Sequence, residues 1–293
     1  MKILVFGKAG QVARSLAERA EFHPEISLVN VGRDRADLEV EGAPGRVIVE
    51  ERPDLVINAA AYTAVDQAED EPDRAFKVNA EAAGQIARAA AGIGAGLIHL
   101  STDYVFDGTA GAPYVEDSPT NPLGVYGRSK LAGEERVRAA HPHATIIRTA
   151  WVYSPFGRNF VGTMMALGGN RDRITVVDDQ SGNPTSAIDL ADALLTLAEA
   201  GGGRTGRIFH LAGAGTATWF DVACQVMAER DRHSLPAAKV AAIKTADWPT
   251  RAARPANSAL DCGAVAAAFG IRLPDWKGSV AHCVTRMARS HAL

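Results

Sequence analysis

The feature that most constrains the fold is the alternation of short apolar runs with longer helical patterns across the first 150 residues. The runs are continuously apolar, which is typical of strands that helices cover on both faces. Strands are predicted at Ile3–Phe6, Ile26–Val31, Leu55–Ile57, Gly96–Leu100 and Ala144–Ile147. Helices are predicted at Gly10–Ala20, Pro44–Glu51, Pro72–Ala91 and Tyr126–Ala139. This order predicts an α/β fold with a doubly wound parallel sheet.

The pattern loosens after Thr149, which divides the chain into two regions. We expect residues 1–150 to form the core of one domain and residues 151–293 to form a smaller, interleaved C-terminal lobe. Segments between residues 174 and 211, among them a predicted helix at Ser186–Glu199, are expected to return in part to the first domain. A length of 293 residues agrees with two such units, because domains average about 150 residues.

Composition excludes several classes of partner. The 31 Lys and Arg against 34 Asp and Glu give a net charge of −3, without the basic excess that nucleic-acid binding requires. Uncharged stretches such as Ala89–Ile98 are too short to span a membrane. The odd number of cysteines and the short apolar start, which is no signal peptide, predict reduced thiols in a cytoplasmic protein.

A glycine turn follows the first predicted strand and opens the first helix. Gly7 and Gly10 would allow a tight turn and a close approach of the backbone to a pyrophosphate at the helix N-terminus. The spacing is GxxGxxA, with Ala13 in the third position, and by itself it is equally typical of an ordinary turn. Its place in a strand–helix–strand unit favours dinucleotide binding.

The end of the second predicted strand carries Arg33 and no acidic residue. An Asp or Glu there would bind the ribose hydroxyls of NADH, whereas a guanidinium suits the 2′-phosphate of NADPH. NADPH is therefore favoured and NADH is not excluded, and a solvated surface arginine is the alternative interpretation. Asp37 lies close enough to accept hydrogen bonds from an adenine amine or to cap a helix.

Tyr126 and Lys130 lie four residues apart at a helix start and therefore on one face. A nearby ammonium favours the phenolate, so we expect Lys130 to lower the pKa of Tyr126 and make it an acid–base group. A YxxxK pair alone usually marks an exposed helix face. Here Ser101, Thr102 and Asp103 also end a predicted strand, at the sheet edge where α/β proteins place ligands, and the combination predicts a catalytic site.

Small residues follow the third predicted strand at Asn58–Thr63. They would let a nicotinamide ribose lie close to the sheet edge, and tight loop packing is the alternative. Val65 and Asp66 are expected where this loop meets the pocket.

Short motifs spread along the chain carry a resemblance to a known family. They are Gly7–Val12, Asn58–Asp66, Ser101–Gly108, Tyr126–Lys130, Arg148–Tyr153, Asp179–Thr185 and Arg254–Ser258. With them the chain resembles the extended short-chain dehydrogenases/reductases, and among these it is similar to the dTDP-4-dehydrorhamnose reductase family. The resemblance implies a Rossmann-type domain with a smaller substrate-binding lobe. It also implies that the C4 keto group of dTDP-6-deoxy-L-lyxo-4-hexulose is reduced with NADPH to dTDP-L-rhamnose, the last step of dTDP-rhamnose biosynthesis.

The resemblance also implies roles for individual residues. Thr102 would polarise the C4 carbonyl, Tyr126 would protonate its oxygen, and Lys130 would bind the nicotinamide ribose. The implied cofactor residues are Gly7, Gly10, Gln11, Val12, Arg33, Asp37, Leu38, Ala59, Ala60, Ala61, Thr63, Tyr126 and Lys130. The implied substrate residues are Val65, Thr102, Asp103, Tyr126, Trp151, Asn159, Arg254 and Asn257.

The chain departs from some relatives at the first helix. Those relatives bind Mg²⁺ between subunits through carboxylates, one of them on that helix. Here the turn carries Arg14 and Ser15, with Glu18 one turn later, so no metal site is predicted. The sequence leaves open whether the protein forms a homodimer. It also leaves open two other functions: reduction or epimerisation of another keto-sugar nucleotide, and service as a catalytically silent NADP-binding regulatory subunit.

Overall fold

A six-stranded parallel sheet forms the body of the molecule, in the order β10-β5-β4-β3-β1-β2. The structure, a computed structural model, describes residues 1–290. The strands are β1 (Lys2–Phe6), β2 (Ser27–Val31), β3 (Leu55–Asn58), β4 (Gly96–Thr102), β5 (Thr145–Thr149) and β10 (Ile208–His210). From β1 the chain adds β2 on one side of the sheet, and then β3, β4, β5 and β10 in turn on the other side. The predicted doubly wound parallel sheet is confirmed.

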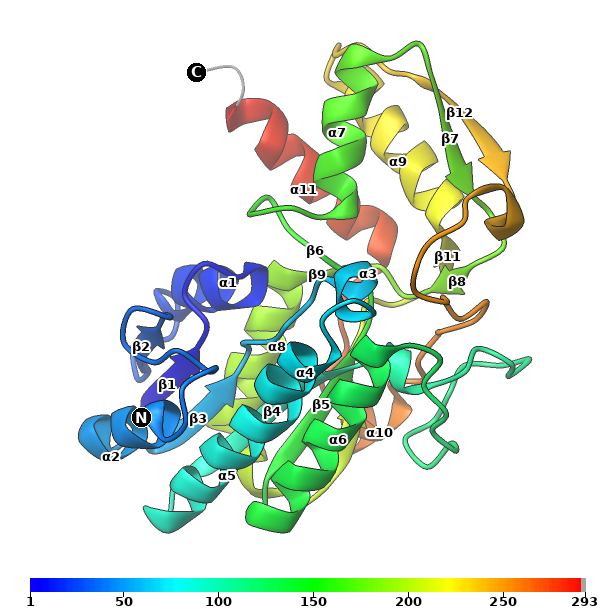
Figure 1. The fold of residues 1–293 in the computed structure, drawn as a ribbon. Coiled ribbons are helices and arrows are strands. Elements are labelled where there is room, and N and C mark those ends of the chain that lie inside the picture. Colours follow the sequence, from blue (N-terminus) through cyan, green and yellow to red (C-terminus); the bar gives the residue numbers. More distant parts are fainter. Residues whose placement is uncertain (291–293) are drawn as a thin grey trace.

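Helices cover both faces of this sheet (Figure 1). On one face lie α1 (Gln11–Ala20), α8 (Ala187–Glu199) and α10 (Gly263–Phe269). On the other lie α2 (Ala43–Glu51), α5 (Ala82–Gly92) and α6 (Val125–Ala140). Alternate residues of β1 serve the two faces, because Ile3 and Val5 pack with α1 and α8 while Leu4 and Phe6 pack with α2 and α5. Burial on both faces explains the continuous apolar runs of the sequence.

Three elements differ from the sequence prediction in ways that bear on the site. The predicted helix Pro72–Ala91 is formed by α4 (Pro72–Phe76), a π-helical segment (Lys77–Glu81) and α5. Strands β4 and β5 extend beyond their apolar runs to Thr102 and Thr149, which pair with each other. Main-chain pairing continues there although the side chains become polar, so the sheet delivers hydroxyl groups to its carboxyl edge.

A smaller lobe lies above the carboxyl edge of the sheet (Figure 1). Its apolar core joins α7 (Phe160–Asn170), α9 (Trp219–Arg232) and α11 (Trp276–Ser290) to a parallel pair, β7 (Arg173–Val177) with β12 (Lys239–Ile243). Of the segments between residues 174 and 211, β10 is a strand of the large sheet and α8 packs on one face of it. Strand β7 belongs to the lobe. The strand β12 has no counterpart in the sequence prediction, because its alanine-rich segment carries a weak strand signal.

Several short elements complete the fold. They are α3 (Val65–Ala68), β6 (Val152–Tyr153), β8 (Ser181–Gly182), β9 (Thr185–Ser186) and β11 (Ala217–Thr218), with 3₁₀ turns at Asp103–Val105, Gly202–Arg204 and Thr245–Asp247. Strand β6 pairs with β9, and β8 pairs with β11. Within residues 1–290, no helix combines the length and the apolar character needed to cross a membrane.

Candidate active site

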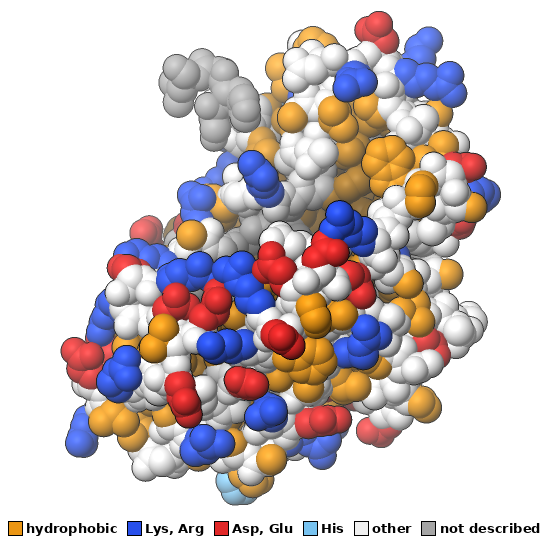
Figure 2. Space-filling model, in the orientation of Figure 1, with side chains coloured by type: hydrophobic (Ala, Val, Ile, Leu, Met, Phe, Trp, Pro, Cys, Tyr) orange, Lys and Arg blue, Asp and Glu red, His pale blue; other side chains and the backbone are white. Residues whose placement is uncertain are grey.

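A cleft of about 820 Å³ lies between the carboxyl edge of the sheet and the lobe. In Figure 2 the surface is hollowed between these two parts, and apolar side chains line the lobe side of the recess. Sixteen of the residues singled out from the sequence line the cleft: Gly7, Gly10, Gln11, Val12, Arg33, Ala59, Ala60, Ala61, Thr63, Val65, Thr102, Asp103, Tyr126, Lys130, Trp151 and Asn159. The fold thus gathers groups from both halves of the chain at one place.

The glycine turn after β1 forms one end of this cleft. Gly7 has a φ of +115°, and a Cβ there would lie 3.3 Å from the Cβ of Ala13, so the turn requires glycine. Gly10 precedes α1 and no side chain caps that helix. A Cβ at Gly10 would meet no atom within 4 Å, which shows that the helix N-terminus is open. An open, uncapped helix N-terminus is suited to bind an anion.

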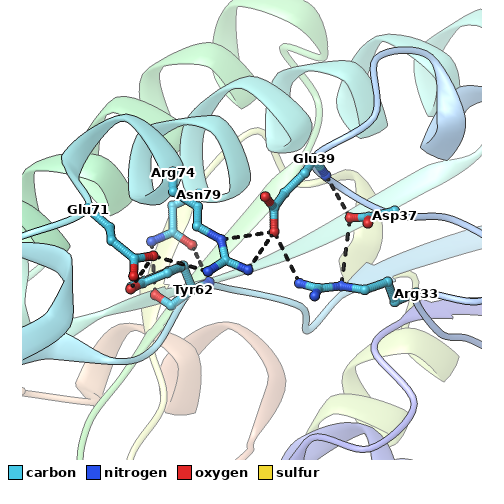
Figure 3. Close-up of polar contacts among 7 residues, drawn as sticks. All are labelled: Arg33, Asp37, Glu39, Tyr62, Glu71, Arg74 and Asn79. Carbon is cyan, nitrogen blue, oxygen red and sulfur yellow. Dashed lines mark hydrogen bonds and ion pairs between the residues drawn. The ribbon is translucent and has the colours of Figure 1, made fainter.

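A smaller pocket of about 320 Å³ adjoins the cleft and shares Gly7, Arg33, Ala60 and Ala61 with it. Leu38 lines this pocket. The side chain of Arg33 is 67% exposed and forms ion pairs with Asp37, at 3.7 Å, and with Glu39, at 3.2 Å (Figure 3). The pocket therefore combines apolar walls with two cations, Arg33 and Lys8. Each already faces carboxylates, because Lys8 pairs with Asp34 at 3.1 Å and Arg33 pairs with Asp37 and Glu39.

Thr102 and Tyr126 bring two hydroxyl groups together on the floor of the cleft. Thr102 ends β4, and its Oγ1 donates to Oδ1 of Asp103 at 2.9 Å while accepting from the main-chain N of Tyr104 at 3.2 Å. Tyr126 lies in the first turn of α6, where a Cβ on Gly127 would overlap the carbonyl oxygen of Tyr104. This glycine therefore lets α6 start close to the loop that follows β4.

Burial is the main influence on the pKa values of Tyr126 and of the neighbouring Asp103. Burial raises the pKa of Tyr126 to about 12, and the nearby Thr102 hydroxyl offsets part of that rise. Burial likewise raises the pKa of Asp103 to about 6, opposed by the hydroxyls of Ser258 and Thr102. The Oδ2 atom of Asp103 has no hydrogen bond of normal length to the described residues. Tyr126 is thus a protonated phenol at neutral pH, ready to donate.

Lys130 is buried, and its Nζ donates to the carbonyl oxygen of Leu100 at 2.6 Å. Burial lowers its pKa to about 8, and the negative charge of Glu134 opposes that change. The expectation that Lys130 lowers the pKa of Tyr126 is wrong in this structure, because the desolvation of the phenol outweighs other influences and raises its pKa. Lys130 does line the same cleft as Tyr126.

A buried ion pair supports the floor of the cleft from behind. Glu134, one turn after Lys130 on α6, accepts from Nε and Nη2 of Arg148 at 2.9 and 2.7 Å and from the hydroxyl of Ser101 at 2.6 Å. Both partners of the ion pair are 3% exposed. Because Ser101 is on β4 and Arg148 on β5, Glu134 fixes α6 to both strands. Its only sequence signal is an acid on the face that also carries Lys130.

Two stacked tryptophans form the lobe side of the cleft. The rings of Trp151 and Trp219 lie 3.6 Å apart and nearly parallel. Trp151 has a φ of +46°, an uncommon backbone conformation for a bulky residue. Asn159 caps α7 by accepting from the main-chain N of Gly162, and it donates to the carbonyl oxygen of Ser154 at 2.8 Å. An aromatic platform of this kind can pack against a sugar or a base.

Three of the predicted cofactor and substrate residues, Asp37, Arg254 and Asn257, line neither the cleft nor the adjoining pocket. The carboxylate of Asp37 faces Arg33 and the main-chain N of Glu39. Arg254 binds Asp66 through two hydrogen bonds, at 3.0 and 2.8 Å. Asn257 donates to the carbonyl oxygens of Ala110 and Ala112, and these two hydrogen bonds hold the loop that contains both alanines. Their side chains are thus engaged within the protein.

The cleft also contains residues that sequence reasoning missed, chiefly Tyr104, Arg158 and Trp219. Tyr104 directly follows the predicted Thr102 and Asp103, so its position was a usable signal. Arg158 lies in the loop between β6 and α7, and Trp219 begins α9, and neither segment carries a local pattern that points to the cleft.

The described residues hold no group of three or more His, Cys, Asp or Glu side chains that could bind a metal ion. Glu18 on α1 instead pairs with both terminal nitrogens of Arg286, at 2.6 Å each. This ion pair joins α1 to α11 of the lobe.

Comparisons with known proteins agree with this geometry. The family model described as RmlD substrate binding domain matches residues 1–289. A dTDP-4-dehydrorhamnose reductase from Sinorhizobium fredii is 45% identical over 97% of both chains. Crystal structures of relatives with this name superpose closely: the Clostridium acetobutylicum protein has a TM-score of 0.92 at 35% identity, covering 98% of this chain and 99% of its own. The Bacillus anthracis protein, in complex with NADP, has a TM-score of 0.90 at 32% identity, covering 97% and 99%. The chain therefore belongs to the dTDP-4-dehydrorhamnose reductase family of oxidoreductases.

Proposed function

We propose that this enzyme uses NADPH to reduce the C4 keto group of dTDP-6-deoxy-L-lyxo-4-hexulose, which gives dTDP-L-rhamnose in the last step of dTDP-rhamnose biosynthesis. The observation that carries the proposal is the convergence of the Thr102 and Tyr126 hydroxyls in a cleft that also contains an open helix N-terminus and an aromatic platform. Keto reduction needs these three parts: a proton donor, a dinucleotide site and a surface for the sugar.

The residues at the sheet edge fit a dinucleotide. The uncapped N-terminus of α1 is open, and the positive φ of Gly7 makes the turn before it, an arrangement that suits a pyrophosphate. The small side chains of Ala59–Ala61, with Thr63, would border the nicotinamide ribose, and Gln11 and Val12 would border the pyrophosphate. Arg33 would bind the 2′-phosphate, and Asp37 and Leu38 would border the adenine. When bound, NADPH supplies a hydride to the sugar.

Tyr126 would donate its proton to the C4 oxygen as negative charge develops there. Its raised pKa keeps it protonated at neutral pH, so it acts as the acid in the reducing direction. The hydroxyl of Thr102 would donate a hydrogen bond to the same oxygen, after giving up its bond to Asp103. Donors placed in advance stabilise charge that exists only in the transition state. Lys130 would bind the ribose and bring a positive charge to the reacting end.

The substrate would lie on the lobe side. Trp151 would pack against the sugar ring, and Val65, Asp103 and Asn159 would border it. Arg254 and Asn257 would contact the nucleotide half only after exchanging their present hydrogen bonds. We accordingly assign dinucleotide binding to residues 1–150 and substrate binding to the interleaved lobe formed by residues 151–293.

The test is oxidation of NADPH by purified protein with a panel of dTDP- and UDP-linked 4-keto sugars. The proposal expects the highest kcat/KM with dTDP-6-deoxy-L-lyxo-4-hexulose, and dTDP-L-rhamnose as the product. Faster turnover of a different keto-sugar nucleotide would reassign the substrate. Tight NADPH binding without turnover of any of them would identify a regulatory protein and refute the proposal.

A further inference from the structure

An ion-pair cluster at the outer edge of the cleft connects Arg33 to a second arginine, Arg74, through one carboxylate. Oε1 of Glu39 accepts from Nη2 of Arg33 at 3.2 Å, and from Nε and Nη2 of Arg74 at 3.0 and 2.9 Å (Figure 3). We call this set, Arg33 with Glu39 and Arg74, the Glu39 cluster. Because Arg74 makes two bonds and both are shorter, Glu39 is held chiefly by Arg74.

Arg74 is the anchored end of the cluster. Its Nη1 donates to Oε2 of Glu71 at 3.0 Å, and its guanidinium lies 5.7 Å from the centre of the Tyr62 ring. Tyr62 is itself fixed, because its main-chain N and O each bond the side chain of Asn79, at 2.8 and 3.1 Å. Asn79 also donates to Ser129 on α6, at 2.9 Å. Arg33, by contrast, extends into solvent with 67% of its side chain exposed.

The charges of the Glu39 cluster bear on the two forms of the dinucleotide in opposite ways. A 2′-phosphate is attracted by the guanidinium of Arg33 and is repelled by a carboxylate beside it. A 2′-hydroxyl needs no cation there. Without Arg74, Glu39 would lose its two shorter bonds and its charge would be left to Arg33, which already faces Asp37 at 3.7 Å. Arg33 would then be neutralised at the place where the phosphate arrives.

We propose that Arg74 is a positioning residue that sets the preference of this enzyme for NADPH over NADH, by holding the carboxylate of Glu39 and leaving Arg33 available to the 2′-phosphate. The proposal deepens the proposed function and rests on its assignment of Arg33. Arg74 does not line the cleft or the adjoining pocket, so it acts through Glu39 and not by contact with the dinucleotide.

The experiment measures Kd for NADPH and for NADH by fluorescence titration without a sugar substrate. The variants are Arg74→Met, Glu39→Gln, the double variant, and Arg88→Met as a control that removes an exposed arginine from α5. We expect Arg74→Met to weaken NADPH binding by about threefold to fivefold, the range of a partly exposed ion pair, with NADH unchanged. We expect Glu39→Gln to tighten NADPH binding by a similar factor. In the Glu39→Gln background, Arg74→Met should have no further effect.

Three results would overturn the proposal. Equal weakening of both dinucleotides would show that Arg74 merely supports the fold. Loss of NADPH affinity in the double variant relative to Glu39→Gln would show direct contact with the phosphate. Unchanged NADPH affinity in Glu39→Gln would show that this carboxylate does not oppose the phosphate, and this variant decides the matter even if Arg74→Met does not fold. Failure of the proposed function would instead appear as absent turnover of the sugar substrate. The Kd measurements use no sugar and are therefore independent of that outcome.

Discussion

Replacing Asp103 by Asn should stabilise the protein at neutral pH. The carboxyl of Asp103 is buried, Oδ1 accepts from Thr102, and Oδ2 lacks a hydrogen bond of normal length among the described residues. An asparagine keeps the acceptor for Thr102 and removes the charge. Active sites commonly bury polar groups that function needs although they lower the stability of the fold. Replacing such a group raises stability and lowers activity.

The magnitude follows from the pKa. Burial raises the pKa of Asp103 from 3.8 to about 6, a difference of about 2 units. Between these values the folded chain binds more protons than the unfolded chain, so this group lowers the stability as the pH rises through that window. At 1.36 kcal/mol per unit, the charged carboxylate costs about 3 kcal/mol above pH 6 and nothing below pH 3.8.

The assay is urea unfolding of the wild-type and Asp103→Asn proteins from pH 4 to pH 8. The account expects the variant to gain up to about 3 kcal/mol in free energy of unfolding at pH 7 to 8, with the gain vanishing towards pH 4. Asp34→Asn is the control, because the hydrogen bond from Lys8 lowers the pKa of exposed Asp34 and its removal should bring no gain. A gain independent of pH, or a loss at neutral pH, would refute the reasoning.

Two further predictions concern Glu134, behind the cleft, and Lys130, which lines it. Glu134→Gln should lower the free energy of unfolding by about 3–5 kcal/mol, since it leaves the buried Arg148 without a countercharge, and a loss below about 1 kcal/mol in urea unfolding would contradict the importance of this pair. The affinity for NADPH should fall as the pH rises through about 8, because Lys130 loses its proton there, whereas Lys130→Met should bind weakly at every pH. Titrations of both proteins from pH 6.5 to pH 9.5 check this, and a pH-independent wild-type affinity would count against a charged role for Lys130.

Local patterns predicted the elements that hold the sheet edge. Strands β1 to β5 and helices α1, α2, α5 and α6 follow from apolar runs and helical periodicity, because each buries its apolar residues in the expected layer. The clustering of Gly7, Thr102 and Tyr126 followed as well, since the carboxyl ends of parallel strands meet at one edge.

What the sequence did not predict depends on contacts between distant segments. Trp219 reaches the cleft because α9 packs in the lobe and stacks its first residue on Trp151. Arg254 is drawn to Asp66, 188 positions away in the chain, and no local pattern contains that pairing. The raised pKa of Tyr126 likewise reflects its burial by the finished fold, which a charge four residues away in the sequence does not reveal.

The central claim is that Tyr126 protonates the reduced keto group, and its most direct test is the turnover of Tyr126→Phe. NADPH oxidation with dTDP-6-deoxy-L-lyxo-4-hexulose is measured for this variant, for wild type and for Tyr153→Phe, which removes a buried tyrosine hydroxyl in the lobe. The account predicts that kcat of Tyr126→Phe falls by at least about 100-fold, the range of a lost general acid, while its Kd for NADPH and the activity of Tyr153→Phe stay near wild type. Wild-type turnover in Tyr126→Phe would contradict it.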